Sequence, residues 1–313
     1  MKIAFYETKP EEREFFSERL AGHDLYFFDG TINEELKEEA DFEVVSLFVH
    51  SRVTDDVLAK LPKLRYLQTR STGYDHIKCT ALYERGLLVS NVAGYGGPAV
   101  AEFAYSLLLN ATRHTWKALQ RAKEGIFEYE DLKGTELYGK RLGILGLGTI
   151  GSRMAHIAKG FGMQVSVWSR TRKPIVDELG LVFTTLERVL ETSDVIMIAL
   201  PLTPATRNLI HKERAKLLKE DAVVVNIARG EIIQKELYTT LPNVLCLDVT
   251  ADLTCIARPN VLYTPHMAYY TREALRRIME ISLENIEAYI EGKPLPNCLK
   301  MPCEKEYGKK DAS

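Results

Sequence analysis

Short apolar runs alternate with amphipathic, helix-like segments along almost the whole chain. In the first third, residues 42–49 and 64–69 are such runs, each followed by a polar loop and a segment of helical character. The pattern returns in the second half, where helical segments separate apolar runs at 194–200, 222–228 and 244–249. Strands that alternate with helices are typical of parallel sheets covered by helices. The sequence therefore predicts an α/β fold with doubly wound parallel sheets.

Two long helical patterns divide these runs into two groups. Residues 98–122 and 271–291 carry apolar side chains at i, i+3 and i+4 spacing. Residues 1–97 hold the first group of strands, and the segment after the second helix, 293–313, is expected to pack back on them. We therefore predict a discontinuous domain of residues 1–97 plus 293–313 and a second domain of residues 98–292.

Composition narrows the class of protein. The 313 residues are 46% hydrophobic and 27% charged, which suits a chain with two folded cores rather than a disordered one. A formal net charge of -2 gives no reason to expect nucleic acid or an anionic membrane surface as a partner. No uncharged apolar stretch reaches the roughly 18 residues of a membrane span, and the cysteines form neither a CxxC pair nor a zinc-ligand spacing. We expect a cytoplasmic protein without a metal site.

The sharpest local motif is a Gly-Leu-Gly-Thr-Ile-Gly run that lies directly between an apolar run and a helical segment. Gly146 permits a tight turn, Gly148 lets the backbone approach a pyrophosphate, and Gly151 lets helix and strand pack closely. The motif opens a helical segment from residue 152, whose unpaired N–H groups and positive dipole end attract phosphate, and Thr149 and Ile150 within the motif are expected to contact the cofactor. Because a strand precedes the motif and a helix follows it, the motif predicts a dinucleotide site.

The end of the next apolar run bears on which dinucleotide binds. An NAD-specific site usually has an acidic residue here, which accepts a hydrogen bond from the ribose 2′-hydroxyl. This sequence has Ser169, Arg170, Thr171 and Arg172 instead. Hydroxyl and guanidinium groups can bind a 2′-phosphate that a carboxylate would repel. We therefore predict that NADP(H) is preferred and that NAD(H) is possible. The alternative is that the two arginines only belong to a solvated loop.

Three further segments follow predicted strands: Asn-Ile-Ala-Arg-Gly at 226–230, Leu-Asp-Val at 247–249 and Thr-Pro-His-Met-Ala at 264–268. Together with the glycine motif they resemble the D-isomer-specific 2-hydroxyacid dehydrogenase family, and the resemblance extends over essentially the whole chain. It implies a Rossmann cofactor domain, a flavodoxin-like substrate domain and a homodimer formed through the cofactor domain. The 264–268 segment and Tyr95 are most similar to D-lactate dehydrogenases, whereas the Ser-Arg-Thr-Arg stretch is more similar to glyoxylate/hydroxypyruvate reductases.

The implied reaction is hydride transfer between NADP(H) or NAD(H) and a small 2-keto or D-2-hydroxy acid such as glyoxylate, hydroxypyruvate or pyruvate. Histidine suits proton transfer at neutral pH, so His266 is the candidate acid and base. Arginine stays charged and offers a planar fork of donors, so Arg229 is expected to bind the carboxylate and polarise the carbonyl. Further substrate contacts are expected from the backbone of Ser71, Thr72 and Gly73 and from Tyr95. Further cofactor contacts are expected from Pro201, Ile227, Ala228, Asp248 and Ala268.

One position departs from the family pattern. Members usually carry a glutamate about five residues after the aspartate that corresponds to Asp248, and this glutamate pairs with the histidine; here Leu253 stands at that position. In one interpretation Asp252 supplies the carboxylate and completes the catalytic set with His266 and Arg229. In the other, no carboxylate reaches His266, which weakens its proton transfer at neutral pH. Asp248 itself is expected either near the nicotinamide carboxamide or as a buried cap.

The departure keeps a second class of function open. Related folds serve as dinucleotide-sensing binding proteins, including corepressors that respond to the NAD(H) redox state. Such a protein would keep the glycine motif and could lose catalysis. Both Arg229 and His266 are present, and sensing alone needs neither. The sequence therefore favours an enzyme, an NAD(P)-dependent D-2-hydroxyacid dehydrogenase, over a sensor.

Overall fold

The computed structural model describes residues 1–77 and 80–299. The chain divides into two compact units, which we call unit 1 (Met1–Tyr95 with Arg272–Ser313) and unit 2 (Gly96–Thr271). Part of the segment predicted to return to the first domain, 300–313, lies outside the described residues. The second domain was predicted to end at residue 292. Unit 2 instead ends at Thr271, before the last long helix.

Helix α12 (Arg272–Ile290) accounts for this difference in the division. Its Leu283 and Ile286 pack in one apolar cluster with Ile3 and Phe5 of the first strand, so the helix belongs to unit 1. The sequence-based prediction grouped it with the other domain, because a helical period shows that a segment is amphipathic but does not show which sheet it covers.

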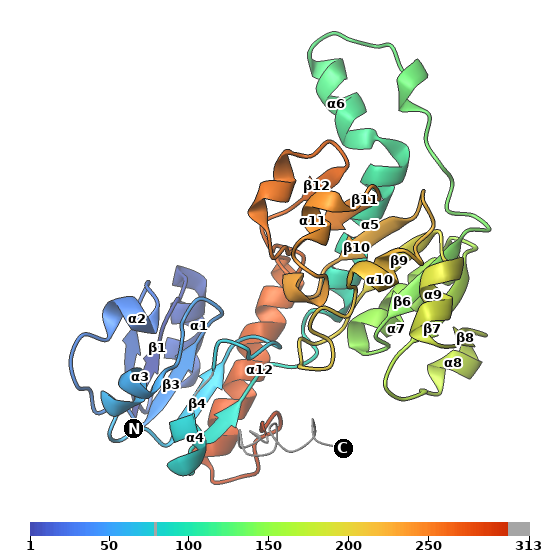
Figure 1. Cartoon of the computed structure of the whole chain (residues 1–313). Helices are drawn as coiled ribbons and strands as arrows, with labels where there is room; N and C mark the ends of the chain where they lie inside the picture. The colour runs from blue at the N-terminus through green and yellow to red at the C-terminus, as the bar shows by residue number, and fades with distance from the viewer. Residues whose placement is uncertain (78–79, 300–313) are drawn as a thin grey trace. The chain divides into compact units, whose positions relative to one another are not determined.

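Unit 1 is built on a five-stranded parallel sheet in the order β2-β1-β3-β4-β5 (Figure 1). Its strands are β1 (Lys2–Phe5), β2 (Asp24–Phe27), β3 (Val44–Leu47), β4 (Tyr66–Thr69) and β5 (Leu88–Ser90). Its helices are α1 (Pro10–Arg19), α2 (Ile32–Glu35), α3 (Asp55–Ala59), α4 (Thr80–Glu84) and α12. Ile3 and Phe5 join one apolar cluster and Ala4 joins another, so both faces of the sheet are covered. The strand order is that of flavodoxin-like folds, as predicted.

Unit 2 has a seven-stranded parallel sheet in the order β12-β11-β10-β9-β6-β7-β8. Its strands are β6 (Arg141–Leu145), β7 (Gln164–Trp168), β8 (Val182–Phe183), β9 (Val195–Ile198), β10 (Val223–Asn226), β11 (Val244–Leu247) and β12 (Val261–Tyr263). Its helices are α5 (Gly97–Arg113), α6 (Thr115–Lys123), α7 (Thr149–Gly160), α8 (Ile175–Glu178), α9 (Leu186–Thr192), α10 (Lys212–Ala215) and α11 (Leu237–Thr240), with 3-10 turns η1 (Glu130–Leu132), η2 (Gly230–Ile232) and η3 (Leu253–Ala257). The order reverses between β6 and β9, which is where Rossmann folds bind dinucleotides.

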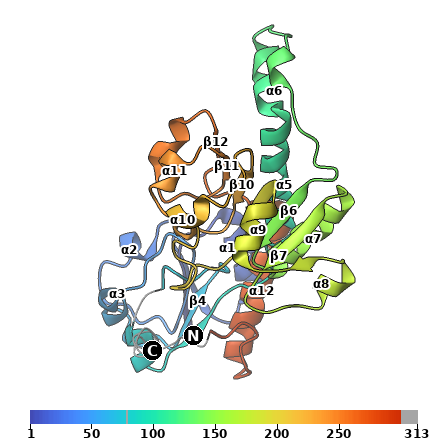
Figure 2. The ribbon, with the colours of Figure 1, turned by 45° about the vertical axis from the view of Figure 1, so that its right-hand side comes forward.

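The long helix predicted over 98–122 is two helices. His114 lies between them with a φ of 51°, in the left-handed region, which ends α5 and redirects the chain into α6. Most of α5 packs into the core of unit 2, whereas α6 has no buried residue. Figure 1 and Figure 2 both show α6 extending away from the sheet of this unit.

Candidate active site

The glycine turn between β6 and α7 is shaped by close backbone contacts. Gly146 has a φ of 101°, and a Cβ there would lie 2.5 Å from the carbonyl oxygen of Ala199. A Cβ at Gly151 would overlap the carbonyl oxygen of Gly146. Both positions therefore require glycine for reasons internal to the fold. Ala199 directly follows β9, so the turn lies at the point where the strand order reverses.

Gly148 differs from these two glycines. A Cβ at this position would meet no atom within 4 Å, so the protein leaves open space in front of α7. Gly148 is also the N-cap of α7, and no side chain caps that end of the helix. Open space beside uncapped N–H groups fits a pyrophosphate, which is the predicted use of the motif.

The loop after β7 holds its two arginines differently. The Arg172 guanidinium pairs with Asp177 and lies over the Phe183 ring, 5.8 Å from its centroid. Arg170 is exposed, and within the described parts of the chain it has no hydrogen bond or ion pair. The Ser169 hydroxyl donates to the Thr171 carbonyl oxygen (2.8 Å), which closes the loop on itself. Arg170 is therefore the cation that the loop leaves most available.

The turn after β10 carries Arg229, which is half-buried. Its backbone is extended, with a φ of -145°, and its Nη1 donates to the Ala228 carbonyl oxygen at 2.8 Å. The next residue, Gly230, is packed so tightly that a Cβ would overlap the backbone of Thr250 and Ala251. The turn is thus pressed against the loop that follows β11.

The turn after β12 carries His266 in an unusual conformation. Its φ of 54° lies in the left-handed region, which a non-glycine residue rarely adopts. Its N–H donates to the carbonyl oxygens of Asp248 (3.0 Å) and Thr264 (2.9 Å). The imidazole is exposed, and its centroid lies 6.3 Å from that of the Tyr269 ring, at 81° between the planes. The backbone therefore fixes the place from which an accessible imidazole projects.

Asp248 holds this turn from the end of the neighbouring strand β11. It is completely buried, and its Oδ1 accepts from the Thr264 hydroxyl (2.7 Å) and the Met267 N–H (2.9 Å). Its Oδ2 accepts from the Ala268 N–H at 2.9 Å. The structure thus shows the buried capping role that the sequence left as an alternative. The contact of Asp248 with a nicotinamide carboxamide stays a prediction, as does that of Ala268 with the cofactor.

These turns share one edge of the sheet. Strand β11 pairs with β10 on one side and β12 on the other, and the Asp248 N–H donates to the Asn226 carbonyl oxygen at 3.0 Å. The glycine turn follows β6 of the same parallel sheet. The carboxyl ends of parallel strands meet at one edge, so Arg229, His266 and the glycine turn lie along it. Pro201, Ile227 and Ala228 follow β9 and β10 at the same edge.

Asp252 is bound to its own loop. Its Oδ1 accepts from the Thr254 N–H (3.0 Å) and hydroxyl (2.7 Å), and it caps η3. These hydrogen bonds lower the pKa of Asp252 below its ordinary value, so its carboxyl is charged at neutral pH. Both bonds use Oδ1 and leave Oδ2 for another donor. Leu253, at the position of the family's glutamate, is 65% exposed. The pairing of Asp252 with His266 stays a prediction.

In unit 1, residues 71–73 form a turn after β4 whose carbonyl oxygens are all used inside the unit. The Ser71 carbonyl accepts from the Val92 N–H (3.0 Å), that of Thr72 from the Asn91 amide (2.7 Å), and that of Gly73 from the Ser71 hydroxyl (2.6 Å). The Thr72 hydroxyl also bonds inward, to the Val92 carbonyl oxygen at 2.8 Å. Because the carbonyl and hydroxyl groups of this turn are already hydrogen-bonded within the unit, its backbone N–H groups are the donors that could bind a carboxylate.

Tyr95 is buried, and its carbonyl oxygen accepts from Arg277 Nε of α12 at 2.8 Å. Its predicted place beside the substrate stays a prediction. Among residues 1–77 and 80–299 no cluster of metal-ligand type occurs, and no helix is long and apolar enough to cross a membrane.

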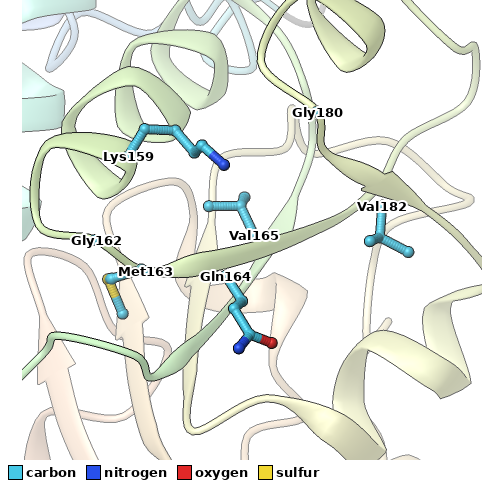
Figure 3. Close-up of a pocket in the computed structure, with 7 residues that line it drawn as sticks. All are labelled: Lys159, Gly162, Met163, Gln164, Val165, Gly180 and Val182. Atoms are coloured by element: carbon cyan, nitrogen blue, oxygen red, sulfur yellow. The ribbon is translucent and has the colours of Figure 1, made fainter.

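A surface pocket of unit 2 lies away from this edge. Figure 3 shows it around the start of β7. The glycine turn follows the opposite end of β6 in the same sheet. The lining residues of the pocket are Lys159, Gly162, Met163, Gln164, Val165, Gly180 and Val182. None of them is a predicted site residue, so the pocket is separate from the candidate active site.

Comparison with known proteins agrees with this geometry. The model of the D-isomer specific 2-hydroxyacid dehydrogenase NAD binding domain matches residues 105–268, more than half of the chain. The chain belongs to this family. It is an oxidoreductase, an NAD(P)-dependent D-2-hydroxyacid dehydrogenase, and the matched segment contains the glycine turn, Arg229 and His266.

Individual relatives cover nearly the whole chain. D-lactate dehydrogenase of Escherichia coli is 30% identical, over 95% of this chain and 99% of that protein. Glyoxylate reductase of Aeropyrum pernix is 35% identical, over 84% of each chain. The structure of D-lactate dehydrogenase from Aquifex aeolicus with NAD and lactic acid aligns with a TM-score of 0.86 at 29% identity, covering 96% of this chain and 99% of that one.

Proposed function

We propose that this protein reduces a small 2-keto acid, such as glyoxylate, hydroxypyruvate or pyruvate, to the D-2-hydroxy acid, with NADPH as the preferred cofactor. The observation that carries the proposal is the edge of the unit 2 sheet, where turns bearing Arg229 and His266 lie in line with an uncapped, glycine-lined helix end. A dinucleotide sensor needs the last of these features but not the first two.

Each side chain has a distinct task in this reaction. A nicotinamide cofactor bound at the glycine turn would supply the hydride for this reduction. Arg229 binds the substrate carboxylate and draws electron density toward the carbonyl oxygen. His266 gives that oxygen a proton and recovers one in the reverse direction. In unit 1 the N–H groups of residues 71–73 add donors for the carboxylate, and Tyr95 contributes to substrate selection.

Asp252 is proposed as the carboxylate that supports His266. The loops after β11 and β12 leave the sheet at neighbouring strand ends, and Oδ2 of Asp252 is not used by Thr254. A carboxylate near an imidazole favours its protonated form and orients its ring. This arrangement would replace the glutamate that the family pattern places one residue later.

The preference for NADPH is supported by Arg170. It is exposed in a loop without an acidic residue at 169–172, whereas Arg172 forms an ion pair with Asp177. We expect Arg170→Ser to lower the ratio of kcat/KM with NADPH to that with NADH by about tenfold. Arg172→Ser is the matched control and should change the ratio less. A wild-type ratio below one would contradict the preference.

A homodimer formed through α6 is the proposed assembly. This helix buries none of its residues. Trp116 and Leu119 of the helix, and Phe127 and Tyr129 of the segment that follows it, are exposed. Apolar side chains in such a row are typical of a protein interface. Leu119→Glu should shift the mass measured by light scattering from dimer to monomer. Val182→Glu changes a similarly exposed apolar residue elsewhere in unit 2 and should leave the dimer intact. A monomeric wild-type protein would contradict the proposal.

A substrate panel tests the proposed function most broadly. NADPH oxidation is followed by absorbance on addition of glyoxylate, hydroxypyruvate or pyruvate, and the configuration of the product is determined. We expect turnover with at least one acid and a D product. Tight cofactor binding without turnover on any acid would favour the sensor.

A further inference from the structure

Two hydrogen bonds between backbone groups close the turn that carries Arg229. The Arg229 carbonyl oxygen accepts from the Ile232 N–H (3.3 Å) and that of Gly230 from the Ile233 N–H (3.1 Å), which start η2. These bonds fix the chain beyond the turn, but not the path from β10 to Arg229. Two buried polar side chains fix that path.

Asn226 is the first of them. It is completely buried at the end of β10, its Oδ1 accepts from the Ala228 N–H (3.1 Å), and its Nδ2 donates to the Arg229 carbonyl oxygen (3.0 Å). The amide thus binds the backbone on both sides of the Ala228–Arg229 peptide. Nδ2 has a second hydrogen, which points to the hydroxyl of Tyr238 at 3.3 Å.

Tyr238, on α11, is the second. It is also completely buried, and its hydroxyl donates to the Gly230 carbonyl oxygen at 2.8 Å while it accepts from Asn226. Its single hydroxyl hydrogen is committed to Gly230, so the direction of both bonds is set. Burial raises the pKa of Tyr238 above its ordinary value, so the phenol remains a donor throughout the physiological pH range.

We propose that Tyr238 is a positioning residue for Arg229: its hydroxyl locks the Asn226 amide and the Gly230 carbonyl, and so fixes the backbone from which the guanidinium projects. The inference rests on the role proposed for Arg229 above. Nothing in the sequence pattern marks this residue, because a tyrosine in an apolar helical segment is usually a core residue.

Tyr238→Phe tests the inference, since it removes one oxygen atom and keeps the ring. Without the hydroxyl, the Gly230 carbonyl and the Asn226 amide each lose a buried partner, and the turn gains freedom. We expect kcat/KM for glyoxylate with NADPH to fall by about tenfold, and the Kd of NADPH to change by less than about twofold because the glycine turn is untouched.

Tyr105→Phe is the matched control. Tyr105 is also buried in unit 2, and its hydroxyl donates to the Met154 carbonyl oxygen at the same distance, 2.8 Å. Both variants are assayed well below their unfolding temperatures. The control should lose similar stability but keep kcat/KM within about twofold of wild type, which separates positioning from general loss of packing.

A double-mutant cycle with Arg229→Gln gives the decisive result. If the hydroxyl acts through Arg229, Tyr238→Phe should change kcat/KM in the Arg229→Gln background by less than about twofold. An equal fall in both backgrounds overturns the inference, and so does a Tyr238→Phe variant with wild-type kinetics. In both of these cases an active wild-type enzyme leaves the proposed function standing. A wild-type protein that reduces no 2-keto acid overturns the proposed function and this inference with it.

Discussion

The turn that carries Arg229 and the turn that carries His266 are held in different ways. In the first turn the backbone of Arg229 is extended, and neutral groups hold the turn: the amide of Asn226 and the phenol of Tyr238. The His266 turn contains a left-handed residue, and the buried carboxylate of Asp248 holds it with three hydrogen bonds. The turn with the strained backbone is therefore the one that a charged side chain holds.

Magnitudes explain why the two clamps differ. A non-glycine residue in the left-handed region costs roughly 1–3 kcal/mol. Hydrogen bonds to a charged group each contribute about 1.5–3 kcal/mol, and those between neutral groups about 1 kcal/mol. Three hydrogen bonds to the Asp248 carboxylate can offset the cost of the left-handed backbone at His266. The extended backbone of Arg229 has no such cost, so the neutral side chains only have to orient it. Strand β11 serves both turns, because the Asp248 N–H also bonds the Asn226 carbonyl.

The largest expected effect is that of Asp248→Asn. The amide keeps one acceptor oxygen but turns its N–H groups toward a donor, so the His266 turn loses at least one of its buried bonds. We expect kcat/KM to fall by about a hundredfold or more and the free energy of unfolding by about 3 kcal/mol. Steady-state kinetics and urea unfolding check both values; wild-type kinetics would show that the clamp does not position His266.

Gly230→Ala disturbs the other turn. Its Cβ would overlap the backbone of Thr250 and Ala251, which must shift. We expect kcat/KM to fall by about tenfold to a hundredfold and stability by about 1–3 kcal/mol. Gly148→Ala is the matched comparison: its Cβ enters open space, so apoprotein stability should be nearly unchanged while NADPH binds more weakly. Equal stability of the two variants would contradict the close packing under Arg229.

Asp252→Asn tests whether His266 depends on the Asp252 carboxylate in addition to the Asp248 carboxylate that holds its turn. Asparagine also caps helices, so the loop should keep its bonds to Thr254. We expect kcat to fall by about tenfold or more at neutral pH because His266 loses its charged partner. Thr254→Ala, which keeps the carboxylate, should stay near wild type. Unchanged kinetics in Asp252→Asn would mean that this carboxylate serves only η3.

Asp194 provides a carboxylate clamp at the opposite edge of the same sheet. It accepts from the Arg141 N–H (2.8 Å) and Lys219 Nζ (2.7 Å). Burial alone would raise the pKa of Asp194, but these bonds outweigh it and hold the pKa below its ordinary value. Such a group stabilises the fold above the unfolded pKa of about 4, and this contribution is lost as pH falls through the lower folded pKa.

Asp194→Asn should therefore cost about 1 kcal/mol of unfolding free energy at pH 7 and progressively less below about pH 4, with kcat unchanged. Urea unfolding across this range checks the sign. A cost that grows as pH falls would contradict it, and a fall in kcat would show that carboxylate clamps matter at both edges.

Much of the fold can be predicted from local sequence patterns, whereas the contacts that hold the candidate active site in place cannot. Period and spacing predict the strands, the glycine turn and the edge where Arg229 and His266 lie, because strand ends and glycine spacing are readable along the chain. The break at His114 was missed because a left-handed histidine leaves the helical period intact. Tyr238 was missed because its role depends on a contact with Gly230, and the membership of α12 depends on Ile3 and Phe5, far away in sequence.

The most direct measurement is kcat/KM for glyoxylate and NADPH with His266→Gln beside the wild-type enzyme, together with the Kd of NADPH for each. With His266 as the proton donor, kcat/KM should fall by about 10²–10⁴-fold while the Kd of NADPH stays within about twofold. A variant that reduces glyoxylate at the wild-type rate would show that the proton comes from elsewhere, and that the strained turn serves another purpose.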